Sequence, residues 1–214
     1  YQNTYTFTYV DAQLMKRNYP DNDAYKWMPT MNMFTMDIGS RLGDDMIHYK
    51  DEENGTLNKF FGSDDGEKFN NQSAVYKFLD LLATEDNKVF SSPFNLDLTA
   101  GKLNHTFWFM NSVNSVKAMK KVLNNHYFFK KYRVIAAAGD NDNEGNDTVQ
   151  LVRDSIQKNP LTITLSCGKL NTGITIKQWD GVLMLDDTVS AESYWQTAFR
   201  VERQNPSVNK TDCF

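Results

Sequence analysis

The sequence predicts an α/β fold in its second half, with a parallel sheet covered by helices on both faces. One observation is a set of four short apolar runs with the length and composition of buried strands, at 106–110, 132–138, 161–165 and 182–185. The second is that segments with apolar residues at helical spacing lie between these runs. Strands that alternate with such helices are typical of parallel sheets.

Each helix is indicated by its own spacing or cap. The apolar positions are Val113, Val116, Met119 and Leu123 in the first helix, and Val149, Val152 and Ile156 in the second. Pro160 lies just beyond the expected end of the second helix. Ser190 is expected to cap a last helix that runs to about residue 203.

The first hundred residues predict an irregular α+β lead-in. Residues 4–9 alternate threonine with aromatic residues, which favours a strand, and 33–38 favour another short strand. Residues 39–71 are acidic and rich in Gly, Asn and Asp, which indicates a mobile connection. Ser73 is expected to cap a helix at about 73–83. We therefore divide the chain into a lead-in at 1–100 and a compact domain at 101–214.

The composition sets further limits. The 214 residues are 40 % hydrophobic and 23 % charged, as in globular proteins, and the net charge of −4 argues against a general nucleic-acid coat. Two cysteines and the absence of a long apolar run favour a cytoplasmic protein without a membrane span. The chain starts at Tyr1 and stops in what resembles the start of a strand, so we expect a piece of a longer polypeptide.

Most enzyme signatures are missing from the sequence. It has no phosphate-binding P-loop, no dinucleotide fingerprint and no His-Glu-x-x-His metal motif, and its three histidines are scattered singly. Asp186 and Asp187 end a predicted strand, where carboxylates can meet Mg²⁺, but two acids without a third favour a turn. We therefore predict no metal site.

Two segments carry candidate chemistry. On the last predicted helix, Gln196, Arg200 and Arg203 fall at i, i+4 and i+7, which predicts one polar stripe suited to phosphate oxygens. An ordinary solvated helix face is the alternative interpretation. Upstream, residues 165–175 place a strand and a polar loop before the next strand, and Gly173 there favours a tight turn or the close approach of another chain.

Together these segments resemble motifs V and VI of superfamily 2 helicases and translocases. Residues 196–203 match the family pattern Gln-x-x-Gly-Arg-x-x-Arg at Gln and at both Arg, with Phe199 in place of Gly. The stretches 170–175 and 199–203 are most similar to the R subunits of type I restriction enzymes, with Thr175 in place of an Asp. Residues 106–112 and the helix after them are similar to motif IV, so the resemblance covers roughly 105–214.

The resemblance implies a RecA-like (P-loop-NTPase-like) fold and a motor that binds ATP with Mg²⁺ between two RecA-like domains. The main ATP site would lie on a first domain of the same polypeptide, and the other implied partners are double-stranded DNA and the methyltransferase and specificity subunits. The implied catalytic residues are Arg203 as arginine finger, Arg200 as its companion on the γ-phosphate, and Gln196. Gly173 and Thr175 would couple nucleotide to DNA, and Asn111, Ser112 and Thr172 would contact DNA phosphates.

The function expected from the sequence is thus the second motor domain of a DNA translocase in a restriction–modification enzyme, inactive without its first domain. One alternative is the corresponding domain of a superfamily 2 DNA-repair helicase. Another is a non-catalytic α/β module whose Gln/Arg face docks an acidic protein partner. Tight partner binding that is indifferent to ATP and nucleic acid would distinguish this last alternative.

Overall fold

We analysed a computed structural model of the chain. The residues that the structure describes are 14–22, 25–36, 42, 56–83, 94, 103–138, 145–168, 170, 174–188, 190–208 and 210–214. The strand expected at 4–9 lies outside these residues. None of the described helices combines the length and the apolar composition that crossing a bilayer requires.

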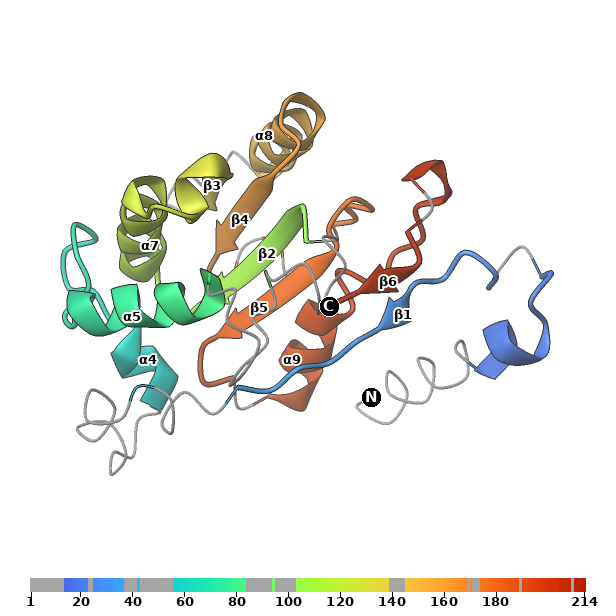
Figure 1. Ribbon diagram of the computed structural model, residues 1–214, viewed down its shortest axis with the longest axis horizontal. Helices are drawn as coiled ribbons and strands as arrows, with labels where there is room; N and C mark the ends of the chain where they lie inside the picture. Colours follow the sequence, from blue (N-terminus) through green and yellow to red (C-terminus); the bar gives the residue numbers. More distant parts are fainter. Residues whose placement is uncertain are drawn as a thin grey trace.

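The centre of the molecule is a four-stranded parallel sheet, as the sequence predicts (Figure 1). Its strands are β2 (His105–Met110), β3 (Arg133–Ala137), β4 (Thr162–Ser166) and β5 (Gly181–Leu185). Their order in the sheet is β3-β4-β2-β5, and Phe107 of β2 pairs with Thr164 on one side and Val182 on the other. The carboxyl end of β2 therefore lies between neighbours in the interior of the sheet, which is consistent with a RecA-like α/β fold.

Helices cover both faces of this sheet (Figure 1). Trp108 and Met110 point to the face that packs on α5 (Gln72–Ala83) and α7 (Val113–Asn125). Phe107 points to the opposite face, where α8 (Gly145–Lys158) packs. Successive side chains of a strand alternate between faces, so one strand anchors two separate apolar cores. Burial of each such large side chain contributes roughly 1.5–3 kcal/mol.

Part of the predicted lead-in shares the first of these cores. Helix α4 (Thr56–Phe60) and helix α5 bring Phe60, Phe61 and Phe78 together, with the rings of Phe61 and Phe78 in edge contact at 5.2 Å between centroids. The interpretation of residues 39–71 as a mobile connection is wrong for its end, because Phe60 and Phe61 are fully buried and order α4. The boundary at residue 100 stays a prediction.

The helix expected at about 73–83 is confirmed as α5, but its cap differs from the expected one. The helix begins at Gln72, and the backbone N–H of Ala74 donates to Asn71 Oδ1 at 3.3 Å. Asn71 thus accepts from the first turn in the manner of a capping side chain, and Ser73 already lies inside the helix.

The two ends of the described chain meet beside β5 (Figure 1). Strand β1 (Thr30–Met31) pairs in parallel with β6 (Asp212–Cys213), and the short strand expected at 33–38 is not found in its described part, 33–36. Phe214 then continues onto the main sheet, because its carbonyl accepts from the N–H of Val182 at 2.7 Å. The strand expected at the end of the chain is confirmed.

Glycine is required where β5 begins. A Cβ added to Gly181 would lie 2.4 Å from the side chain of Leu103, closer than real Cβ contacts allow. Two short 3₁₀ helices complete the described chain, η1 (Phe129–Lys131) and η2 (Pro206–Val208).

Candidate functional site

The last helix, α9 (Ala191–Ala198), is shorter than its sequence predicts. Ser190 caps it as expected, since its hydroxyl accepts from the N–H of Ser193 at 3.3 Å. The helix ends at Ala198, and Phe199 starts a series of tighter turns in which Arg200 N–H donates to the carbonyl of Thr197. Val201, which is 1 % exposed, turns inward to the second core, and this burial diverts the chain from the helical path.

The single stripe of Gln196, Arg200 and Arg203 is therefore wrong. Gln196 is half-buried on α9, where its amide donates to Glu192 Oε1 at 3.0 Å. Arg203 is exposed in an irregular segment beyond the helix, and Arg200 is only 7 % exposed. The three side chains occupy three different environments because the helix that would align them ends at Ala198.

Arg200 faces the protein instead of solvent. Its guanidinium Nη1 donates to the carbonyl oxygen of Ile174, which precedes the predicted contact residue Thr175. Burial lowers the pKa of Arg200, and the charge of nearby Arg203 lowers it further. The two arginines are thus close enough to interact electrostatically, although only Arg203 is open to solvent.

A buried ammonium group anchors the segment that carries Arg203. Lys210 Nζ donates to the carbonyl oxygens of Trp179 and Val201, and at longer range to those of Lys177 at 3.4 Å and Arg203 at 3.3 Å. Hydrogen bonds from a charged donor are stronger than neutral ones. Lys210 therefore ties the backbone at Val201–Arg203 to the loop before β5.

The surroundings of Lys210 perturb several titrations. Burial lowers the pKa of Lys210 to about 8, although Cys213, Asp180 and Glu202 partly oppose this shift. Burial raises the pKa of Asp180 to about 7, against the effect of the N–H groups of Asn104 and His105 that donate to its carboxylate. Burial also raises the pKa of the Cys213 thiol to about 12. Shifts of this kind occur at functional sites and in structural polar networks alike.

The second candidate segment is only partly described. Thr172 and Gly173 lie outside the described residues, whereas Thr175 is exposed and its carbonyl accepts from Arg153 Nη2 at 3.4 Å. Ile174 and Thr175 thus lie between two arginines, Arg200 and Arg153. The structure brings this segment next to the end of α9, as the order of the motifs suggests.

A polar cleft of about 460 Å³ lies at the carboxyl end of β2. Asn111 and Ser112 line one side, and α4 with the loop after it lines the other. The Asn111 amide donates to the carbonyl of Asn58 at 2.8 Å. Ser112 caps α7, since its hydroxyl accepts from Ser115 N–H at 3.1 Å. Both predicted DNA contacts therefore lie together, and both side chains already have partners within the protein.

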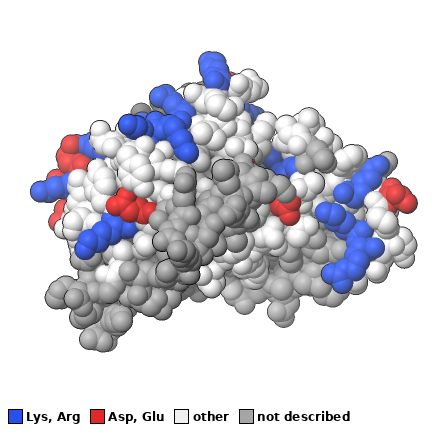
Figure 2. Space-filling view, viewed as in Figure 1, with Lys and Arg blue, Asp and Glu red and all other residues white. Residues whose placement is uncertain are grey.

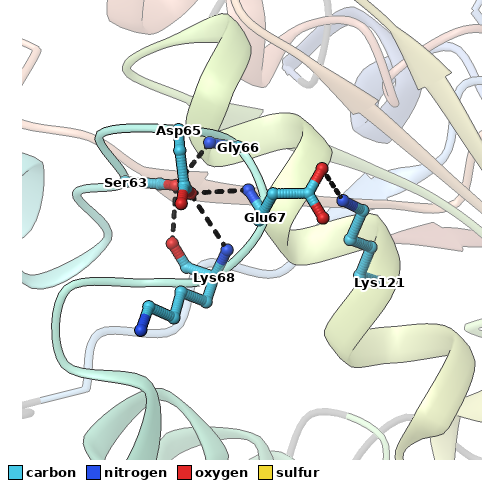
Figure 3. A network of polar contacts seen from close by, with 6 residues as sticks. All are labelled: Ser63, Asp65, Gly66, Glu67, Lys68 and Lys121. Carbon is cyan, nitrogen blue, oxygen red and sulfur yellow. Dashed lines mark hydrogen bonds and ion pairs between the residues drawn. The ribbon is translucent and has the colours of Figure 1, made fainter.

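The loop that forms the other wall of the cleft is internally bonded (Figure 3). Asp65 Oδ1 accepts from the N–H groups of Glu67 and Lys68, and Ser63 Oγ accepts from the N–H of Gly66. These bonds hold the carboxylate as the charged acceptor and lower the pKa of Asp65. Among the cleft residues, Lys59 and Asp64 carry opposite charges.

The pair Asp186 and Asp187 serves the local structure. Asp186 accepts from the Thr188 hydroxyl at 2.7 Å, and Asp187 Oδ2 accepts from Asn58 N–H at 2.8 Å. In the part of the chain that the structure describes, no three His, Cys, Asp or Glu side chains gather in a way that could hold a metal ion.

Sequence reasoning missed Lys210 and Asp180 as parts of this region. Neither stands in a recognisable motif, and a lysine in a polar segment normally indicates a solvated side chain. The one usable signal was the apolar stretch around β5 and β6, which leaves little water near residue 210.

Comparison with known protein families gives no match. One similar protein is the "Putative type II restriction enzyme and methyltransferase RM.MpnORF110P C-terminus" of Mycoplasma pneumoniae, 28 % identical over 141 residues, which cover 63 % of this chain. The chain spans about a fifth of that relative's length, since the match covers 20 % of it. This similarity supports a relationship of the chain to restriction–modification proteins.

Proposed function

We propose that this chain is the second motor domain of an ATP-dependent DNA translocase in a restriction–modification enzyme of the type I kind. The observation that carries the proposal is the position of Arg203, an exposed guanidinium whose backbone carbonyl accepts from the anchored Lys210 ammonium. An arginine that acts on a ligand from outside must be both accessible and fixed in place. Arg203 meets both requirements.

The fold and the similarity support the same proposal. The parallel α/β sheet is of the class that such motor domains use, and the relative is named as a restriction enzyme and methyltransferase. The DNA and the methyltransferase and specificity subunits are the partners this function would require. The first RecA-like domain would come from elsewhere in the polypeptide.

The residues of this chain fit unequal roles toward ATP with Mg²⁺. Bound nucleotide supplies a γ-phosphate whose negative charge spreads during transfer. Arg203 is the residue that fits a contact with this charge, as an arginine finger. Arg200 fits a positioning role instead of the phosphate contact implied by the family resemblance, because its guanidinium already bonds Ile174. Gln196 would orient water or phosphate after release from Glu192.

Residues that would couple ATP to DNA lie on two segments. Gly173 and Thr175 belong to the loop that Arg200 holds at Ile174, and we propose that they transmit nucleotide state to Thr172 and the DNA. Asn111, exposed beside the polar cleft, would contact a phosphate through its amide. Ser112 would contribute through the N-terminal N–H groups of α7, since its hydroxyl is the helix cap.

The decisive experiment compares Arg203→Ala with Arg17→Ala, another exposed arginine, in the full-length polypeptide. We expect DNA-stimulated ATP turnover to fall by ~10³ or more for Arg203→Ala. It should not change for Arg17→Ala. Far-UV circular dichroism and the urea midpoint should match the wild type in both variants. Turnover that survives Arg203→Ala in a folded protein would refute the motor function.

A second measurement uses the 214-residue chain by itself. We expect no ATP turnover with or without duplex DNA, because the proposal assigns the main phosphate cradle to another domain. DNA-stimulated hydrolysis by this chain would contradict the proposal. A repair helicase would give the same kinetics, and the full reading frame distinguishes it through the presence of methyltransferase sequence.

A further inference from the structure

A basic surface covers α7 and the segment that follows it. Residues 98–139 contain seven Lys and Arg residues and no Asp or Glu, in a chain with an overall net charge of −4. Six of the seven are described, and all six are exposed: Lys117, Lys120, Lys121, Lys130, Lys131 and Arg133. We call these six residues the basic strip. Figure 2 shows Lys and Arg side chains gathered over the region where α7 ends and β3 begins.

The geometry of α7 aligns the first half of the strip. Lys117, Lys120 and Lys121 are three or four residues apart, so they share the helix face opposite the buried side chains. A helix of this length extends for ~20 Å. Lys130 and Lys131 continue the strip on η1. Like charges at i and i+4 destabilise a helix, so the cluster is unfavourable for folding alone.

The loop shown in Figure 3 organises one end of the strip. Gly66 has a φ of 74°, and a Cβ added there would lie 3.2 Å from Cβ and Cδ of Lys117, so the lysine stem packs on this glycine. Glu67 pairs with Lys121 at 2.5 Å (Figure 3). Among the ion pairs of the described residues, this is the one that involves the strip. One carboxylate therefore partly neutralises an otherwise uniform surface.

Aromatic rings support the other end. The Lys131 ammonium lies 3.8 Å from the ring centroid of Phe128, a cation–π contact that limits its motion. Tyr127 is 64 % exposed beside it. The strip as a whole lies on the outer surface of a helix, whereas single-stranded nucleic acid is usually held in a groove lined with aromatic rings.

We propose that the basic strip binds the phosphate backbone of duplex DNA without reading sequence. Exposed lysines that displace counterions from closely spaced phosphates are sufficient for such binding. A convex helix face fits the outward-facing phosphates of a duplex. The proposal rests on the proposed function only in taking DNA as the substrate, and it requires no ATP. The grip is local, which explains how a chain of net negative charge can hold DNA.

The test measures the binding of a labelled 30-base-pair duplex to the 214-residue chain without nucleotide, between 50 and 200 mM KCl. Replacement of Lys117, Lys120 and Lys130 by Gln removes three cations. We expect affinity at 50 mM KCl to fall at least tenfold, and the slope of log K against log salt to decrease in magnitude by about 2.7. A control triple of Arg17→Gln, Lys158→Gln and Lys177→Gln removes the same charge from exposed sites elsewhere and should leave the slope unchanged.

Glu67→Gln gives a test of opposite sign. This variant releases Lys121, so we expect tighter binding and a slope larger in magnitude by about 0.9. All variants are checked by circular dichroism. The proposal is overturned by an unchanged slope in the strip triple, by an equal loss in the control triple, or by no duplex binding in the wild type at 50 mM KCl.

Two competitors test the choice of ligand. A single strand that binds more tightly than the duplex and loses this binding in Tyr127→Ala would replace the proposal by a stacking site. Polyglutamate of equal charge that binds as tightly as the duplex would indicate an acidic protein partner. Loss of duplex binding in the strip triple, together with surviving turnover in Arg203→Ala, would retain the strip and refute the motor function.

Discussion

The segment after α9 and the surface of α7 treat their charged residues in opposite ways. After α9, Arg200 and Glu202 are buried, and the Lys210 ammonium bonds carbonyl groups inside the fold. On α7, Lys117 and Lys120 are exposed. Charged groups that are buried with partners make large contributions to stability and few direct contacts with ligands, whereas exposed ones do the reverse. The two regions therefore predict different results for substitutions that look alike in the sequence.

Removing the Lys210 charge should have the largest effect. Lys210→Met keeps most of the aliphatic stem but leaves the carbonyls of Trp179 and Val201 without their donor. We expect the free energy of unfolding to fall by about 3–5 kcal/mol. Urea denaturation measures it. Lys177→Met, an exposed lysine, should change it by less than about 0.5 kcal/mol, and equal losses in both variants would remove the distinction between the regions.

Asp180 should make the stability depend on pH. Its pKa of about 7 in the folded protein exceeds the usual 3.8, so the folded state binds the extra proton between these values. The contribution of Asp180 is fully present below pH ~4 and is lost as pH rises through 7, by up to about 4 kcal/mol.

Asp180→Asn keeps an oxygen for the N–H groups of Asn104 and His105 but cannot titrate. Urea unfolding at intervals from pH 4 to 8 should show a flatter profile for this variant than for the wild type. Parallel profiles would mean that Asp180 ionises normally.

The two arginines should separate stability from surface function. Arg200→Ala removes the donor to the carbonyl of Ile174 and leaves a small void, which we expect to cost about 1–3 kcal/mol. Arg203→Ala removes an exposed side chain and should stay within about 0.5 kcal/mol. Thermal and urea unfolding of both variants provide the comparison, and a larger loss for Arg203→Ala would reverse our assignment.

The smallest effect is expected at the start of α7. Ser112→Ala removes the side-chain acceptor of Ser115 N–H and should destabilise the protein by about 1 kcal/mol. Ser112→Asp keeps an acceptor and serves as the matched control for urea unfolding. Equal stability of Ser112→Ala and wild type would mean that solvent satisfies this helix end equally well.

The sequence predicted the sheet well because its strands are apolar runs long enough to need burial on both faces. Phe107 and Trp108 show why: each fills a different core, and no other arrangement hides both. The end of α9 was missed because the pattern of Gln196, Arg200 and Arg203 is compatible with a helix. The burial of Val201, a tertiary effect that spacing does not encode, ends that helix.

The lead-in was the least predictable part. Residues 39–71 have the composition of a loop, and Phe60 and Phe61 stand out only once their partner Phe78 is known to lie nearby. The role of Lys210 depends on carbonyl groups around residues 177–179 and 201–203, contacts between segments that no local motif records. Arg203 was placed correctly as an exposed residue, and its role in ATP turnover stays a prediction.

The pairing of β1 with β6 joins residues that are far apart in sequence, with Thr30 beside Asp212. During synthesis the early strand has no partner until almost the whole described chain has left the ribosome. Contacts of such long sequence separation form slowly, because the loop between them must close first. The four-stranded core can assemble while this edge is still open. Lys210 can reach all its carbonyl acceptors only once residue 210 has been made, so the backbone that carries Arg203 should acquire its final form last.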